Sequence, residues 1–124
     1  TRIQPENLIE ITLRKNGDAD VKAELIDISE RGMGIYMITP LSAQTKVNIN
    51  VQIPGKGAST YSKLEFLGIT VYTILENNPN REMRHRIGMQ IFPDKYAKQI
   101  ITEYISRRQA ELLEEINKSY QSLQ

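Results

Sequence analysis

The sequence predicts a mainly β fold, a six-stranded antiparallel β-barrel followed by one long C-terminal α-helix. Up to residue 93 the chain consists of short β-prone segments separated by Gly, Pro and Asn turns, whereas residues 95–121 contain neither Gly nor Pro. Many short strands with glycine-rich turns usually close into a small barrel, because closure leaves no free sheet edge. The 124 residues are enough for one domain with a real hydrophobic core.

The first part of the chain predicts three strands. Residues 8–13 and 21–26 are rich in β-branched and aliphatic side chains and flank the turn signal Asn16-Gly17, which predicts a hairpin. Residues 34–38 continue as a third strand until Thr39-Pro40 interrupts it.

Three further strands are expected before the helix. Residues 46–53 alternate between polar and apolar side chains, the pattern of a half-buried strand. Residues 59–75 are β-prone over an unusual length, and we expect a break or bulge at Gly68. After a loop at 77–80, residues 86–92 are expected to form the last strand.

From residue 95 the pattern becomes helical. Asp94 is a suitable N-cap, and one apolar stripe follows at mostly three-, four- or seven-residue steps, formed by Ile101, Ile105, Leu112, Ile116 and Leu123. A helix over 95–121 would be about 40 Å long, roughly twice what a small barrel needs to cover one end. We therefore expect the barrel at 1–94 and, at 95–124, a helix that packs on the barrel and extends beyond it.

The composition excludes several classes of function. The 16 basic and 15 acidic residues give a net charge of +1, so bulk attraction to nucleic acid or to an anionic membrane is not expected, and any anion site must be local. The absence of cysteine excludes disulfides and thiolate metal sites and favours a reducing, cytoplasmic location. The sequence has no apolar run of the roughly 18 residues that a membrane span needs, and its acidic residues lack metal-ligand spacing. We therefore expect no membrane span, no metal and no cofactor.

The stretch Asp27-Ile28-Ser29-Glu30-Arg31-Gly32-Met33-Gly34 says most about function. On an extended backbone Asp27 and Ser29 point to the same side, and the glycines allow a sharp turn or the close approach of a ligand. A carboxylate accepts from a pair of N–H donors such as those on the Watson–Crick edge of guanine, and a hydroxyl adds one more bond. Alternatively, Asp27 and Ser29 close a turn by bonding to neighbouring backbone.

Together with its flanking segments, this stretch resembles a PilZ domain, the bacterial receptor module for cyclic di-GMP. The resemblance covers most of the chain, from Arg2-Ile3-Gln4-Pro5 to Arg86-Ile87-Gly88-Met89-Gln90-Ile91-Phe92. The family's binding signature combines Arg-x-x-x-Arg at the barrel entrance with (Asp/Asn)-x-Ser-x-x-Gly between two strands. The second part is complete at Asp27, Ser29 and Gly32, but no Arg-x-x-x-Arg occurs in the sequence. Arg2 resembles the second arginine of that motif, so the first one either would lie ahead of Thr1 or is missing from the motif.

The resemblance implies a role for each motif residue. Arg2 would bind a phosphate or a base, because a guanidinium can clamp a phosphate or meet guanine O6 and N7 with two parallel bonds. Asp27 and Ser29 would bind a guanine, and Gly32 would keep the loop free of a side chain so that the base can approach. Arg31 would add positive charge, or be an ordinary solvated loop arginine.

Two functions follow from these expectations. The first is a cyclic di-GMP receptor that signals by a change of conformation or of partner, and the second is a PilZ-like interaction module that does not bind the nucleotide. The apolar residues on the far part of the helix predict a homo-oligomer, and an upstream domain or a protein partner stays open. An enzyme is not expected, because Asp27, Ser29 and His85 are accompanied by neither a nucleophile elbow nor an oxyanion motif.

Overall fold

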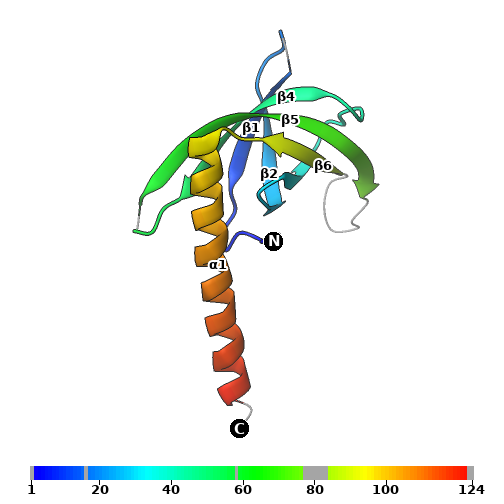
Figure 1. The fold of residues 1–124 in the computed structure, drawn as a ribbon. Coiled ribbons are helices and arrows are strands. Elements are labelled where there is room, and N and C mark those ends of the chain that lie inside the picture. The colour runs from blue at the N-terminus through cyan, green and yellow to red at the C-terminus, as the bar shows by residue number, and fades with distance from the viewer. Residues whose placement is uncertain (1, 16, 58, 77–83, 123–124) are drawn as a thin grey trace.

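The computed structural model describes residues 2–15, 17–57, 59–76 and 84–122, and the expected loop at 77–80 lies outside this range. The described chain is a closed six-stranded antiparallel β-barrel followed by one helix (Figure 1), which confirms the predicted fold class. The elements are β1 (Glu10–Lys15), β2 (Val21–Ile28), β3 (Gly32–Met37), β4 (Lys46–Pro54), β5 (Tyr61–Glu76), β6 (Arg84–Phe92) and α1 (Lys95–Ser122).

The strand order around the barrel is β1-β2-β3-β6-β5-β4, and β1 closes it by pairing with β4. The β3–β6 pairing matters for function, because it places the late strand directly beside the end of the motif stretch. Gly34 of β3 lies opposite Gly88 of β6, and the pairing of β6 with β5 then sets Gly88 opposite Tyr72.

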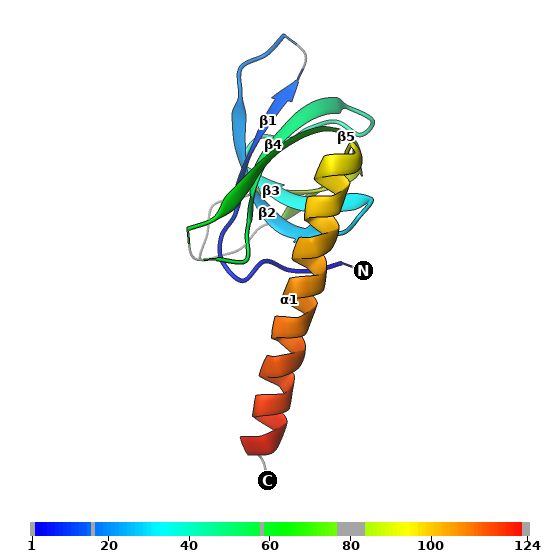
Figure 2. The ribbon, with the colours of Figure 1, turned by 60° about the vertical axis from the view of Figure 1, so that its left-hand side comes forward.

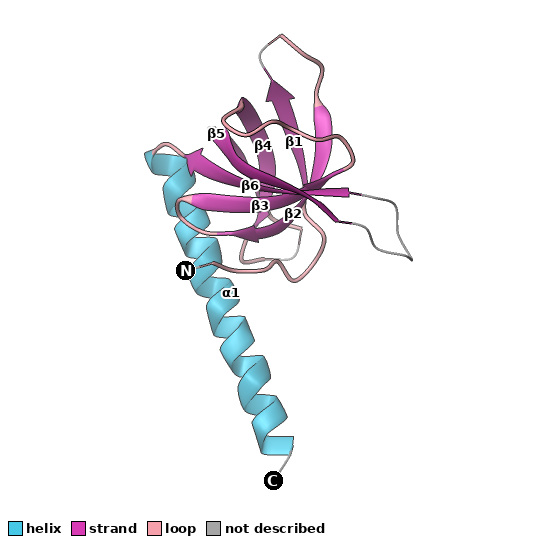
Figure 3. Cartoon of the chain, turned by 90° about the vertical axis from the view of Figure 1, so that its right-hand side faces the viewer, coloured by secondary structure: helices cyan, strands magenta, loops and turns pink. Residues whose placement is uncertain are grey.

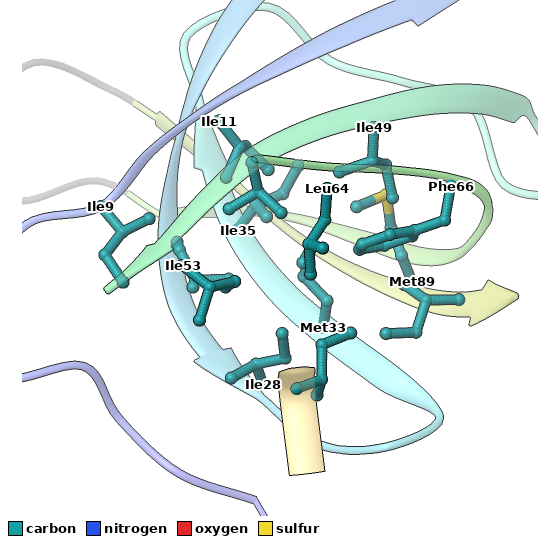
Figure 4. Packing of buried hydrophobic residues seen from close by; sticks show 14 of the residues in the cluster. Ile9, Ile11, Ile28, Met33, Ile35, Ile49, Ile53, Leu64, Phe66 and Met89 are labelled. Carbon is teal, nitrogen blue, oxygen red and sulfur yellow. The ribbon is translucent and has the colours of Figure 1, made fainter. Parts of the chain in front are cut away.

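The inward faces of the strands fill the barrel with aliphatic side chains, which Figure 4 shows gathered in its interior. The alternation predicted for residues 46–53 is confirmed, since Val47, Ile49, Val51 and Ile53 are all at most 3% exposed. These inward side chains leave the intervening residues of each strand to form the outer surface of the barrel.

The expected break at Gly68 is wrong. β5 is continuous, and its register shift lies between Thr70 and Tyr72, whereas Gly68 pairs regularly with its neighbours on both sides. A Cβ on Gly68 would lie 2.6 Å from Cδ1 of Ile49. Gly68 therefore makes room for a core side chain and does not interrupt the strand.

The helix begins as predicted, because the Ala97 N–H donates to Oδ1 of Asp94 at 2.8 Å, which is the N-cap bond. The first half of α1 packs against the barrel (Figure 2) through four buried hydrophobic residues, Ala97, Ile101, Tyr104 and Ile105. Leu112 still packs partly against this core, whereas every described residue from Leu113 onwards is exposed, and Figure 3 shows this part of the helix clear of the barrel. Among the described residues, no helix combines the length and apolar character needed to span a bilayer.

Candidate functional site

The candidate site lies on the outer face of the barrel, where two glycines of β3 leave room above the backbone for side chains from other segments. Met33, Ile35 and Met37 point into the core, so the alternation of the strand turns Gly32 and Gly34 outwards. Neither position is open space, because side chains from neighbouring segments lie directly over both glycines.

Asp27 reaches this outer face through a bulge in β2. The register of the β2–β3 pair shifts between Leu25 and Asp27, so Leu25 and Ile28 point into the core while Asp27 lies opposite the outward-facing Gly34. A Cβ on Gly34 would be 2.7 Å from Oδ1 of Asp27. The carboxylate therefore lies directly against the Gly34 backbone, and the Asp27 side chain is only 11% exposed.

Arg2 is held beside Asp27 by the N-terminal segment. Ile3 forms an isolated antiparallel bridge with Ile28, with both N–H···O distances at 2.9 Å, which fixes the backbone next to Arg2. Nη1 of Arg2 donates to Oδ1 of Asp27, and Nη2 lies 2.8 Å from where a Cβ of Gly32 would be. Gly32 thus accommodates the half-exposed Arg2 guanidinium, just as Gly34 accommodates the carboxylate.

A second arginine faces the same carboxylate. Nη2 of Arg86, in β6, lies 3.9 Å from Oδ2 of Asp27, and Nη1 lies 3.9 Å from Oε1 of Glu76. The sequence marks Arg86 as the start of the expected last strand and as part of a basic run that could extend a cationic rim or be an ordinary charged loop. The pairing of β3 with β6 brings it to the site from 59 positions further along the chain than Asp27.

Ser29 and Gly32 close the turn between β2 and β3. The Gly32 N–H donates to Oγ of Ser29 at 3.1 Å, and the Ser29 N–H donates to the Gly32 carbonyl at 2.8 Å. This is the backbone-bonding alternative for Ser29, but it does not apply to Asp27, whose partners are arginines. The Arg31 side chain is exposed at the tip of this turn, and its carbonyl accepts from the Ile91 N–H at 3.0 Å.

The sequence reasoning missed one aromatic residue of this surface, Tyr72. A Cβ on Gly88 would lie 2.1 Å from Cε1 of Tyr72, so the ring rests on the glycine backbone. The signal was present in the sequence, because an isolated glycine within a strand often marks the close approach of another group. Its partner could not be identified without the β5–β6 register.

The arginines of this face are paired with carboxylates. Arg2 and Arg86 share the carboxylate of Asp27, and Arg86 also lies near Glu76, so the charges of these four groups balance. In the adjacent row the Arg84 guanidinium lies 4.1 Å from the centroid of the Tyr36 ring. Burial, and then a hydrogen bond to Glu76, raise the pKa of Tyr36, so its phenol stays neutral beside these arginines.

Two other arrangements do not form a site here. His85 lies opposite the inward-facing Met37, on the other side of the sheet from Asp27, so the three residues of a hydrolase-like set are not brought together. In the part of the chain that the structure describes, no group of three or more acidic or His residues could hold a metal ion.

A separate hollow of about 730 Å³ lies between the segment around residues 6–10, strands β1, β4 and β5, and the helix. Two arginines that line it already bond to backbone carbonyls, Arg107 to Pro54 and Arg108 to Gln4. No motif residue predicted from the sequence lines this hollow. These two arginines therefore serve mainly to hold the fold together.

No protein-family model matches the sequence, and a search of curated proteins finds no significant match. Solved structures do match its fold. The PilZ domain of YcgR from Escherichia coli with c-di-GMP superposes with a TM-score of 0.69 at 15% identity, covering 95% of each chain. K. pneumonia MrkH in its apo state gives 0.76 at 16% identity over 93% of this chain. The inhibitor of motility MotI from Bacillus subtilis gives 0.71 at 12% identity over 90% of this chain.

The chain spans about half the length of the MotI and MrkH chains, 51% and 52% respectively, but nearly the whole YcgR domain. It therefore has the fold of PilZ domains, which confirms the fold that the sequence resemblance implies.

Proposed function

We propose that this chain, which has the fold of a PilZ domain, is a receptor for cyclic di-GMP that binds the dinucleotide on the outer face of β2, β3 and β6. The observation that carries the proposal is the arrangement of Arg2 and Asp27 over the bare backbone of Gly32 and Gly34. The solved YcgR domain of the same fold is in complex with c-di-GMP. A binding role, not catalysis, and a cytoplasmic location are part of this proposal.

The residue types suit the ligand, which is a dianion with two guanines. The half-exposed Arg2 guanidinium has donors beyond the one used by Asp27 and can bind a phosphate or a guanine. The Asp27 carboxylate has about four lone-pair positions, so it can hold an arginine and still accept from a guanine N1–H and amine. Ser29 would add a bond at the edge of the site, and Arg31 would add charge at the turn.

The same geometry provides a route for signalling. Arg2 is paired with Asp27, so a ligand that uses either group must rearrange that pair. Arg2 belongs to a short segment whose next residues are tied to β2 through Ile3 and to α1 through the bond from Arg108 Nε to the Gln4 carbonyl at 3.1 Å. A displacement of Arg2 is thereby transmitted to the helix.

Titration calorimetry with cyclic di-GMP tests the proposal. For a protein that carries the first arginine of the motif ahead of Thr1, we expect a micromolar or lower Kd, which is a binding free energy of about 8 kcal/mol or more. The 124 residues alone should bind more weakly. Arg2→Ala, Asp27→Ala and Ser29→Ala should each weaken binding by about 10- to 100-fold, Ser29→Ala least, because each removes a bond to a charged or polar ligand group.

Two controls accompany this series. Asp20→Ala removes a carboxylate that is paired with Arg14 in the β1–β2 hairpin, away from the site, and should leave the affinity unchanged. Cyclic di-AMP lacks the guanine donor pair and should bind far more weakly. Undetectable binding of cyclic di-GMP, or an affinity that Asp27→Ala leaves unchanged, would refute the proposal.

A second function, a homo-oligomerisation module, is favoured by the exposed end of α1. Leu113, Ile116 and Tyr120 are 61%, 62% and 65% exposed and recur at three- and four-residue steps, so they form one apolar stripe. This stripe differs from the expected one, because Leu112 packs partly on the barrel and Leu123 lies outside the described residues. We propose that two copies pair along it.

Light scattering on the full chain and on a chain ending at Ala110 tests this pairing. We expect a dimer for the full chain and a monomer for the shortened one. Leu113→Gln with Ile116→Gln should give the same monomer without shortening the helix, whereas Glu114→Gln, an exposed neighbour, should leave the dimer intact. A monomeric full chain would exclude this role.

A further inference from the structure

We infer that Tyr72 and Arg86 complete the ligand site, Tyr72 as the stacking surface for a guanine and Arg86 as a second guanidinium for a phosphate. The inference rests on the proposed function and adds two residues that the motif does not contain.

One structural feature recurs on this face of the barrel. Three outward-facing glycines each lie beneath a side chain from another segment: Gly32 beneath Arg2, Gly34 beneath Asp27 and Gly88 beneath Tyr72. At Gly88 the fit is closest, because an added Cβ would lie 2.1 Å from Cε1 and 2.5 Å from Cζ of the tyrosine. The side chains of Arg2, Asp27 and Tyr72 therefore each pack on an outward-facing glycine of the same surface.

The strand register places Tyr72 in line with Asp27. Four residues form one cross-strand row on the outer face, in the order Asp27, Gly34, Gly88 and Tyr72. The Tyr72 ring packs on β6, and neighbouring strands are about 5 Å apart. The ring therefore lies about one strand spacing from Gly34 of β3. One side of the ring rests on Gly88, while the residue is 41% exposed, so the opposite side is available to a base.

The donors of Arg86 are available to a ligand. Its two carboxylate neighbours, Asp27 and Glu76, are each 3.9 Å away, beyond hydrogen-bond length, and its side chain is 38% exposed. These carboxylates hold the guanidinium near the site without using its directional donors. With Arg2, it provides two guanidinium groups for a ligand that has two phosphates.

Tryptophan fluorescence tests the role of Tyr72, because the chain has no tryptophan of its own. In Tyr72→Trp the single indole should show a saturable quench as cyclic di-GMP is added. In Tyr61→Trp, placed at an exposed position near the start of the same strand, emission should not change although calorimetry shows the same binding. Tyr72→Leu should weaken binding by about 10- to 100-fold and Tyr72→Phe by less than about threefold, since only the first removes the stacking face.

Charge-neutral substitution tests the role of Arg86. Arg86→Gln should weaken binding by about 10- to 100-fold, whereas Arg14→Gln, in the hairpin away from the site, should leave it unchanged. Thermal melts of all variants establish that they are folded. Binding of cyclic di-GMP that is unaffected by both Tyr72→Leu and Arg86→Gln would overturn this inference while leaving the proposed function intact. Absence of binding by the Tyr61→Trp control would overturn both.

Discussion

Gly34→Ala should disturb the site through the single methyl group that it adds. That carbon would lie 2.7 Å from Oδ1, 3.3 Å from Cγ and 3.4 Å from Oδ2 of Asp27, so the carboxylate must retreat until the contact is about 3.4 Å, an ordinary van der Waals separation. Asp27 has little room to do so, because its side chain is 11% exposed and is held by Arg2. The substitution therefore strains the arginine–aspartate pair without removing either charge.

The magnitude follows from two opposing effects. Overpacking of a well-packed position costs about 1–3 kcal/mol, and the loss of glycine freedom in the unfolded chain returns about 0.4–1 kcal/mol. We expect the free energy of unfolding to fall by about 1–2 kcal/mol, and Tm by roughly 4–8 °C for a domain of this size. Affinity for cyclic di-GMP should fall by about tenfold or more, because a distorted Asp27 loses a charge-assisted bond.

A double-mutant cycle isolates the cause. In the Asp27→Ala background the clashing carboxylate is absent, so Gly34→Ala should be neutral or slightly stabilising, with a coupling of about 1–2 kcal/mol in urea unfolding. Gly57→Ala, in the β4–β5 turn, is the matched control, because its added carbon meets only Oγ1 of Thr60 at 3.1 Å within 4 Å. Equal destabilisation by Gly34→Ala in both backgrounds would refute the proposed contact.

Three further predictions concern the helix and its attachment. Asp94→Ala removes the N-cap bond to Ala97 and should cost about 1 kcal/mol in urea unfolding followed by circular dichroism, while Asp94→Asn should cost little. Burial raises the pKa of Tyr104, so the folded chain should lose stability as the pH rises above about 10, the ordinary tyrosine value, towards the raised pKa. The Tyr104→Phe variant should lose less stability in thermal melts between about pH 8 and 11. An equal loss of stability in both proteins would show that ionisation of Tyr104 is not its cause. Arg108→Ala leaves the Gln4 carbonyl without its helix donor and should lower hydrogen-exchange protection of the Ile3 and Ile28 amides, whereas the exposed Lys118→Ala should not.

The secondary structure was largely predictable because its signals are local. The alternation over residues 46–53 and the cap at Asp94 depend only on neighbouring residues, and both are confirmed. Gly68 was misread because its cause is tertiary, the Cδ1 atom of Ile49 on the adjacent strand. A glycine within a strand signals close approach, but the sequence does not say whether the approaching group is the chain's own backbone or a side chain.

The candidate site was predictable where its residues belong to a motif. The spacing of Asp27, Ser29 and Gly32 identified the turn, and the family resemblance identified Arg2, which the bridge between Ile3 and Ile28 brings to Asp27. For Arg86 the sequence suggested no more than a cationic rim, and it gave no role to Tyr72, because both reach the site through the β3–β6 and β6–β5 pairings. The bulge before Asp27 was also missed, yet it decides that this carboxylate faces outwards and not into the core.

Chemical-shift mapping of the ¹⁵N-labelled chain during titration with cyclic di-GMP locates the binding site on the barrel. Saturable shifts should be concentrated at the amides of Ile3, Ser29, Gly32, Gly34 and Gly88, which surround Arg2 and Asp27 on the outer face. Amides on the strand side of the hollow, such as those of Gln52 and Lys63, should not move. Shifts concentrated at these strand amides, or no saturable shifts at all, would contradict binding at the outer face.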